Sequence, residues 1–177
     1  MFTPSWIEGI PLPLGDGKTA GQTVALADEE GFERGTRAGD LARAYQERPR
    51  TRVYESLNVR SDGWFSLVSL HLAGLLRRHV VCTAYESHSG DSNLGAHVDR
   101  WLGLIVQMRG AKQWRLGTAE DGPPDTFVMR AGDVLVLPEH VTHDVSTPAH
   151  SVHLVFAVTG QSIETWATEV MGLRQQP

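Results

Sequence analysis

Two residues of the sequence, His97 and Asp99, have the types and the spacing to hold a metal ion. In a β-strand, side chains two residues apart project from the same face, so a strand here would bring an imidazole and a carboxylate to one point. A second histidine would complete a set of two histidines and one carboxylate, which binds Fe(II) and leaves coordination positions open for reactants. The triplet His97-Val98-Asp99 is weak evidence alone, because such triplets also occur by chance on protein surfaces.

The third ligand could come from one of several later histidines. The candidates are His140, His143, His150 and His153. The segment 132–138, Gly-Asp-Val-Leu-Val-Leu-Pro, indicates a tight turn, an apolar strand and a proline stop, and His143 follows that proline by five residues. A barrel of short strands could deliver a side chain to its mouth in this way. We therefore prefer His143 and keep His140 as its main competitor.

The elements that must position these residues are mostly β-strands. After residue 80, short runs rich in β-branched and aromatic residues alternate with turn sequences, and no helical pattern lies between them. About seven short strands at this spacing indicate a β-sandwich or barrel rather than a parallel sheet. The expected strands are 80–85, 102–108, 113–116, 126–129, 134–137, 143–146 and 152–158.

The remaining elements surround this barrel in what we expect to be a single domain. Prolines and glycines disfavour helix before Thr19, so this part is expected to be an extended, packed arm. Thr36 and Ser61 could cap two of the expected helices, and 52–58 could be an edge strand. The helices expected are 36–46, 64–78 and 162–173. The resulting division is an N-terminal arm with a short helix at 1–60, a helix at 61–79, the barrel at 80–160 and a C-terminal helix at 161–177.

The composition argues against several other classes of protein. The 177 residues are 41% hydrophobic and 21% charged, which is typical of a globular domain. The net charge is −5 and the basic residues are scattered, so no nucleic-acid partner is expected. We expect no membrane partner and no signal peptide, because no segment approaches about 20 apolar residues and the start lacks a basic region before an apolar run. The single cysteine, Cys82, lies in an apolar run and fits a buried thiol in a reducing, cytoplasmic compartment.

Four ordered blocks resemble the JmjC-type cupin oxygenases, in particular the ribosomal-protein hydroxylases. Tyr85 stands twelve residues before the His-x-Asp block at His97. Residues 107–114 read Gln-Met-Arg-Gly-Ala-Lys-Gln-Trp, and the block 132–138 is followed by its histidine. Residues 149–153 are similar to the final barrel strand of the family. The resemblance runs from about Gly63 to the C-terminus and implies a mostly β fold, a double-stranded β-helix (jelly-roll or cupin), with flanking N-terminal and C-terminal helices.

The resemblance also implies a role for each matched residue. The Fe(II) ligands would be His97, Asp99 and His143. Lys112 would bind the distal carboxylate of the cosubstrate 2-oxoglutarate, since little water screens an ion pair inside a narrow barrel. Tyr85 would be the hydroxyl partner of the same carboxylate, and His153 would line the cosubstrate pocket. Trp114 is expected to be a core residue.

The implied activity is hydroxylation of an unactivated C–H bond with O2, coupled to conversion of 2-oxoglutarate to succinate and CO2. The substrate would be an amino-acid side chain in a peptide or protein, or a free or carrier-bound amino acid, and a homodimer is compatible with the resemblance. Two other classes stay open: a non-catalytic cupin that binds a ligand, and a cupin metalloenzyme that does not use 2-oxoglutarate. His140 stands where the family usually has glycine, and the loop 88–93 is more polar than the family's, so the substrate does not carry over directly.

Overall fold

The structure is a computed structural model of the 177-residue chain and describes residues 23–35, 40–60, 63–118 and 122–170. The predicted N-terminal arm, the Thr36 and Ser61 caps and the last residues of the predicted C-terminal helix lie outside the described residues.

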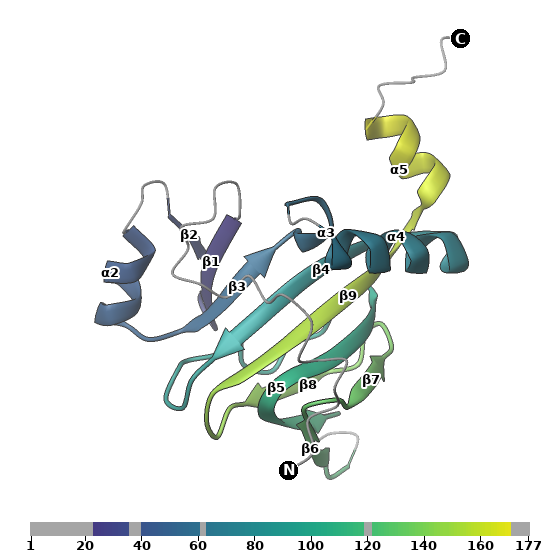
Figure 1. The fold of residues 1–177 in the computed structure, drawn as a ribbon. Helices are drawn as coiled ribbons and strands as arrows, with labels where there is room; N and C mark the ends of the chain where they lie inside the picture. The colour runs from purple at the N-terminus through teal and green to yellow at the C-terminus, as the bar shows by residue number, and fades with distance from the viewer. Residues whose placement is uncertain (1–22, 36–39, 61–62, 119–121, 171–177) are drawn as a thin grey trace.

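A curled antiparallel sheet of nine strands is the main element of the described structure (Figure 1). Along the sheet the order is β2-β1-β3-β4-β9-β5-β6, and β7 and β8 both pair with β5. The expectation of a mostly β protein is therefore confirmed. The strands are β1 (Thr23–Asp28), β2 (Gly31–Arg34), β3 (Thr51–Glu55), β4 (Arg78–Ser87), β5 (Leu102–Leu116), β6 (Asp125–Arg130), β7 (Val134–Leu137), β8 (His143–Ser146) and β9 (Ser151–Ser162).

The described helices are short, and two of them, at residues 57–60 and 64–76, contribute buried residues to the core. They are α2 (Asp40–Glu47), α3 (Leu57–Arg60), α4 (Trp64–Leu76) and α5 (Ile163–Val170). Helix α4 lies across β4, where Phe65 and Ala73 join the buried core, and it ends at Arg77 in a left-handed conformation (φ 54°). None of the described helices is long and apolar enough to span a membrane. The cytoplasmic location expected from the sequence stays a prediction.

Two expectations for the N-terminal half need correction. No local pattern predicted the hairpin of β1 and β2, which extends the sheet beyond β3. The strand predicted at 52–58 is present as β3, but it is not an edge strand, because it lies between β1 and β4. It is also shorter than predicted, because the chain turns into α3 at Leu57. Pairing with a distant strand decides whether a strand is an edge, and the local pattern does not contain that information.

Strand β5 runs continuously where the sequence predicted two strands and a turn. Its first part pairs with β9 and β7, and residues 111–116 pair with β6 and β8. A register shift between Gln107 and Arg109 marks a β-bulge, and Gly110 follows with a φ of 64°. The buried Gln107 amide holds the bulge by donating to the Arg109 carbonyl at 2.7 Å and to Ser151 Oγ at 2.8 Å. The bulge allows β5 to bend, so that its first part pairs with β9 and β7 and its last part pairs with β6 and β8.

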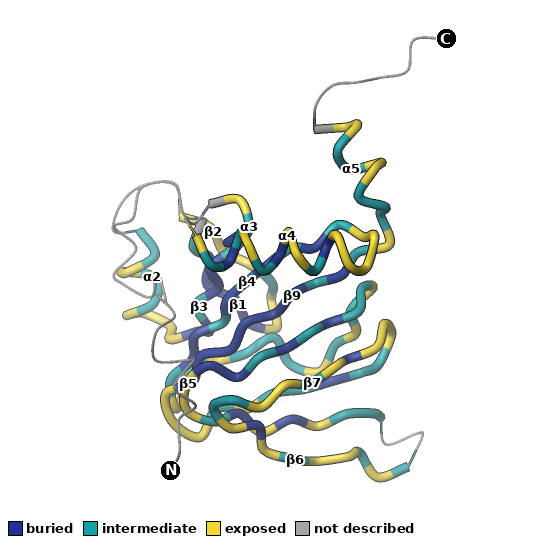
Figure 2. Tube along the Cα trace, turned by 45° about the vertical axis from the view of Figure 1, so that its right-hand side comes forward, coloured by how far each residue is buried: buried dark blue, intermediate teal, exposed yellow. Residues whose placement is uncertain are grey.

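Buried side chains form two layers on either side of β9, which is buried along most of its length (Figure 2). Leu154 and Phe156 pack in the layer under α4. Between them, Val155 faces a second layer with Ile105 and Trp114, inside the curl of the sheet. Alternation along a strand thus assigns one set of residues to the helix-covered face and the next set to the interior of the curl.

Substitution of Gly110 should show how much the fold depends on the bend in β5. A Cβ at Gly110 would lie 2.0 Å from the His150 carbonyl oxygen, and the positive φ is itself unfavourable. We expect Gly110→Ala to lower the free energy of unfolding by about 2–5 kcal/mol in urea titrations. Gly117→Ala is the matched control, because Gly117 has a φ of 93° and nothing within 4 Å of a Cβ, so it should cost only about 1–2 kcal/mol. Equal losses would contradict the close contact.

Candidate metal centre

Two backbone hydrogen bonds fix the segment that carries His97 and Asp99. The His97 amide donates to the His143 carbonyl at 3.0 Å, and the His143 amide donates to the His97 carbonyl at 2.9 Å. A third bond, from the His140 amide to the Asp99 carbonyl, is 2.8 Å long. The expectation that His97 and Asp99 lie on a strand was wrong, because His97 forms only an isolated bridge with the first residue of β8. Both side chains nevertheless line the same cavity.

The side chains of His97, Asp99 and His143 come together at this bridge. Their potential ligand atoms all lie within 4.8 Å of one another, and His143 Nε2 is 3.6 Å from Asp99 Oδ2. His143 is buried, whereas the other two are partly exposed to the cavity. The competing residue, His140, is exposed and stands 3.9 Å from Glu139, outside this group. Its φ of 63° explains why glycine is usual at this position in the family that the sequence resembles.

Hydrogen bonds set the orientation of both imidazole rings. His97 Nδ1 lies 2.9 Å from the Gly95 carbonyl oxygen, and His143 Nδ1 lies 3.0 Å from the Val141 carbonyl oxygen. Because a carbonyl only accepts, each Nδ1 carries the hydrogen and each Nε2 presents a lone pair.

Three acceptors therefore face one point, two imidazole nitrogens and the Asp99 carboxylate. Burial raises the pKa of Asp99 and lowers the pKa of His143, so both charged forms are disfavoured without a cation. A divalent metal ion would reverse the effect on Asp99, because it stabilises the ionised carboxylate, and it would add to the effect on His143, because neutral imidazole is the form that binds a metal. The residues present fit such an ion.

The three side chains open into a cavity of about 420 Å³, a size common for small-molecule sites. Tyr85 and His153 face each other across the β4–β9 ladder, and their rings stack with centroids 5.0 Å apart. Trp114 is buried as expected, and it also forms a cavity wall, where it stacks on His143 at 5.9 Å. The tightly packed aromatic wall limits the positions that a ligand can take.

Lys112 projects into the same cavity as a buried amine. Its Nζ donates to Ser87 Oγ at 3.2 Å, and Ser87 Oγ is 3.0 Å from Thr51 Oγ1. No carboxylate among the described residues forms an ion pair with it. Burial lowers the pKa of Lys112 to about 7, against the negative charge of Asp91, which acts to raise it. An anion beside this amine would restore its charge.

His153 contributes an unsatisfied polar atom to this region. Its buried Nδ1 lacks a hydrogen-bond partner among the described residues. Burial lowers the pKa of His153 well below its ordinary value, and the charge of Lys112 adds to this effect. The structure thus places Tyr85, Lys112 and His153 around one cavity with the three candidate ligands, while their predicted roles stay predictions.

Sequence reasoning missed several polar residues at the cavity. Thr51 and Ser87 were not singled out, because only the pairing of β3 with β4 brings them to Lys112. Asn93 donates to the Val145 carbonyl at 2.6 Å and accepts from the Gly95 amide at 2.7 Å, so it ties the loop before His97 to β8. The polarity of loop 88–93 was noted from the sequence, and it could have pointed to Asn93.

Comparisons with known proteins agree with this architecture. Residues 65–127 match the JmjC domain family. Ribosomal oxygenase 2 of Rattus norvegicus is 31% identical over an alignment that covers 41% of this chain and 20% of the relative, and the Mus musculus protein is 30% identical over the same shares. This chain is thus similar to JmjC-domain oxygenases over part of its length. It spans about a fifth of the length of these curated relatives.

The JmjC-like chain also shares its fold with solved structures. The Escherichia coli ribosomal oxygenase YcfD superposes with a TM-score of 0.62 and 14% identity over 93% of this chain and 49% of that chain. YcfD in complex with cobalt and 2-oxoglutarate gives the same TM-score at 11% identity, again over 93% of this chain and 49% of that chain. At such identities the likeness establishes the fold alone. The cupin fold predicted from the sequence is confirmed.

The pH dependence of stability should report the burial of Lys112. The unfolded chain keeps this proton up to a pKa of 10.5, whereas the folded protein loses it at about 7. Stability should therefore rise between pH 7 and 8.5, by up to ~1.4 kcal/mol per pH unit from this group. Lys112→Met should remove that increment when urea unfolding is compared at the two pH values. Identical pH slopes for the two proteins would contradict the burial of the amine.

Proposed function

We propose that this chain binds Fe(II) and 2-oxoglutarate and hydroxylates an unactivated C–H bond, in an amino-acid side chain of a peptide or protein. The observation that carries the proposal is the convergence of His97, Asp99 and His143 at a cavity whose wall includes Lys112, an amine that forms no ion pair with the described carboxylates. Two histidines and one carboxylate are the ligand set of non-haem Fe(II) oxygenases. The names of the curated relatives, and the 2-oxoglutarate in one structural neighbour, support the same reading.

In this proposal the two histidines bind the metal through Nε2 and Asp99 binds it through its carboxylate. The carbonyls of Gly95 and Val141 fix the orientation of the rings by accepting hydrogen bonds from Nδ1, as the hydrogen-bond partners of histidine ligands do in other metal sites. When bound, iron supplies the oxidation of the substrate by O2, coupled to decarboxylation of 2-oxoglutarate to succinate and CO2. The remaining cavity residues bind and orient the reactants.

Lys112 is positioned to bind the distal carboxylate of 2-oxoglutarate. Its contact with Ser87 holds the amine in the cavity. The carboxylate of the cosubstrate then provides an anionic partner for Lys112. Burial raises the pKa of Tyr85, so its phenol keeps the proton and can donate to the same carboxylate. Ile105 and Val155 line the cavity with apolar surface, which limits the water around this ion pair.

The substrate proposal starts from the names of the relatives. Ribosomal oxygenases give a ribosomal protein as the first candidate, and a free or carrier-bound amino acid is the second. A cupin that only binds a ligand would not need all three candidate metal ligands together with Lys112, and one that uses a metal without 2-oxoglutarate would not need a buried cation. Release of succinate with Fe(II) and ascorbate distinguishes these classes, because neither of the alternatives produces it. A homodimer stays a prediction.

Removal of each proposed ligand should abolish succinate release. His97→Ala, Asp99→Ala and His143→Ala should each lower activity by more than ~100-fold, because each leaves two protein ligands for the metal. His140→Ala is the matched control and should retain Fe(II) binding, since its side chain is exposed and outside the group. Iron content after anaerobic loading gives the second measurement. Loss of iron in His140→Ala together with its retention in His143→Ala would overturn the choice of ligand.

Binding of 2-oxoglutarate should depend on Lys112 and on pH. Lys112→Met should weaken binding by at least ~100-fold, because the buried carboxylate loses its partner. In the wild type the affinity should be greatest below pH 7, where the amine is charged, and should fall by up to ~tenfold per pH unit above it. Calorimetry with Mn(II) in place of iron measures both effects without turnover. Affinity that is independent of pH and of Lys112→Met would exclude this anchor.

A further inference from the structure

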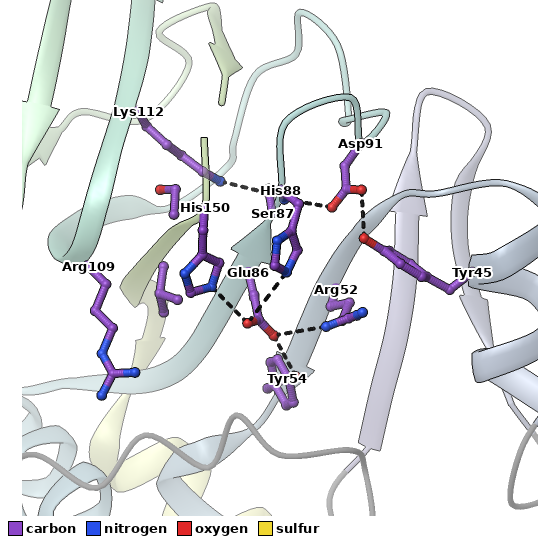
Figure 3. Close-up of polar contacts among 12 residues, drawn as sticks. Tyr45, Arg52, Tyr54, Glu86, Ser87, His88, Asp91, Arg109, Lys112 and His150 are labelled. Carbon is purple, nitrogen blue, oxygen red and sulfur yellow. Dashed lines mark hydrogen bonds and ion pairs between the residues drawn. The ribbon is translucent and has the colours of Figure 1, made fainter. Parts of the chain in front are cut away.

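A second cluster of metal-binding side chains lies outside the cavity. It consists of Glu86, His88 and His150 (Figure 3). Side chains alternate along β4, so one face carries Tyr85, which lines the cavity, and Ser87, whose hydroxyl contacts Lys112. Glu86 therefore projects from the opposite face of the strand. The cluster shares no residue with the candidate centre at His97.

Strand pairing explains why the two histidines meet. In the ladder between β4 and β9, Glu86 pairs with Val152 and Ser87 pairs with Ser151. One step further along each chain places His88 opposite His150, and their rings stack with centroids 4.7 Å apart. His88 and Glu86, two residues apart, project from the same face. All three side chains thus gather at the end of the ladder.

The two oxygens of the Glu86 carboxylate contact different residues. Oε2 accepts a hydrogen bond from the Tyr54 hydroxyl at 2.9 Å and lies 3.5 Å from the Arg52 guanidinium. Oε1 faces the imidazoles, 3.0 Å from His150 Nε2 and 4.0 Å from His88 Nε2. Burial acts to raise the pKa of Glu86, but the bonds from His150 and Tyr54 and the charge of Arg52 outweigh it and hold that pKa below its ordinary value. The carboxylate is ionised and oriented.

The turn that carries His88 is also held in place (Figure 3). The His88 amide donates to Asp91 Oδ2 at 2.7 Å, and the Tyr45 hydroxyl donates to Asp91 Oδ1 at 2.8 Å. The Arg52 guanidinium stacks over the Tyr45 ring at 4.2 Å. These contacts fix the backbone of His88, while its ring stays accessible, with 43% of the side chain exposed. His150 is similarly accessible, at 42%.

We propose that Glu86, His88 and His150 bind a divalent transition-metal ion of the Zn²⁺ class, at a site separate from the one at His97. Two imidazole nitrogens and one carboxylate oxygen are borderline ligands that suit Zn²⁺, with solvent in the fourth position. Tetrahedral bonds of about 2.0–2.1 Å require ligand atoms roughly 3.3 Å apart. The observed atoms lie within 4.8 Å, so small ring rotations close the site. Mg²⁺ and Ca²⁺ prefer oxygen ligands and do not fit this set.

The bound ion would link the residue after the end of β4 to the residue before the start of β9. It therefore stabilises the strand whose other face carries Tyr85 and Ser87, beside the cavity. This proposal does not depend on the function proposed above, because its ligands and its readout are different.

Zinc stoichiometry of the untagged full chain tests the site. Equilibrium dialysis against micromolar Zn²⁺, followed by metal analysis, should give two ions per chain in the wild type, because the His97 group also binds zinc. His97→Ala/Asp99→Ala should retain one ion. Adding His150→Ala to that protein should remove the last one. A wild type that binds one ion, retained in His97→Ala/Asp99→Ala and lost in His150→Ala, would reject the first centre and support the second.

Controls separate ligand loss from unfolding. His88→Ala is the second ligand variant, and its exposed side chain makes misfolding a minor concern. His71→Ala removes an exposed histidine on α4 that belongs to neither group, and should bind as the wild type does. Zinc should raise Tm by a few degrees in His97→Ala/Asp99→Ala but not after addition of His88→Ala, with circular dichroism to confirm folding. Absence of zinc from folded His97→Ala/Asp99→Ala, or binding unchanged by both His88→Ala and His150→Ala, would overturn the proposal.

Discussion

The two backbone hydrogen bonds between His97 and His143 are the constraint on which the candidate centre depends. The segment before β5 has no ladder of its own at this point, so this bridge, together with the hydrogen bond from the Asn93 side chain to the Val145 carbonyl, aligns it with β8. The bridge holds two imidazole lone pairs and a carboxylate at one place, although three acceptors repel one another without a cation. The fold thus sustains a locally unfavourable arrangement, which is what is expected of a site prepared for a metal ion.

Strand β5 supplies the other half of the cavity, and the bend in it explains a whole sequence block. Gln107 holds the bulge, and Gly110 allows the strand to pass close to the His150 carbonyl. Beyond the bend, Lys112 and Trp114 are two residues apart and reach the same interior. Within the block from 107 to 114, the first residues therefore bend the strand, and this bend directs the side chains of the last residues into the interior.

Strand β4 links two chemically different faces. Toward the cavity it presents Tyr85 and Ser87, beside an amine whose charge depends on an anionic ligand. On the other face Glu86 is already ionised and is held by hydrogen-bond donors on β3 and next to β9. Neighbouring residues of one strand thus have opposite electrostatic requirements, because the sheet keeps their environments apart.

Local patterns and spacing in the sequence determined much of this protein. They gave the mostly β class, most strands after residue 80, helix α4 and, through the resemblance, the set of His97, Asp99 and His143 with Lys112 nearby. Periodicity and short motifs are properties of a local stretch of sequence, so these features can be predicted without knowing the fold. The roles of these residues and of Tyr85 and His153 stay predictions.

Only the tertiary structure decided how distant segments meet. It made one strand of two predicted ones, placed β3 inside the sheet and gave His140 a left-handed backbone outside the centre. It also brought Thr51 and Ser87 to Lys112, and His88 to His150. Each of these outcomes depends on the register between strands far apart in the chain. Register is set by the packing of the whole sheet, and so no local stretch of sequence contains it.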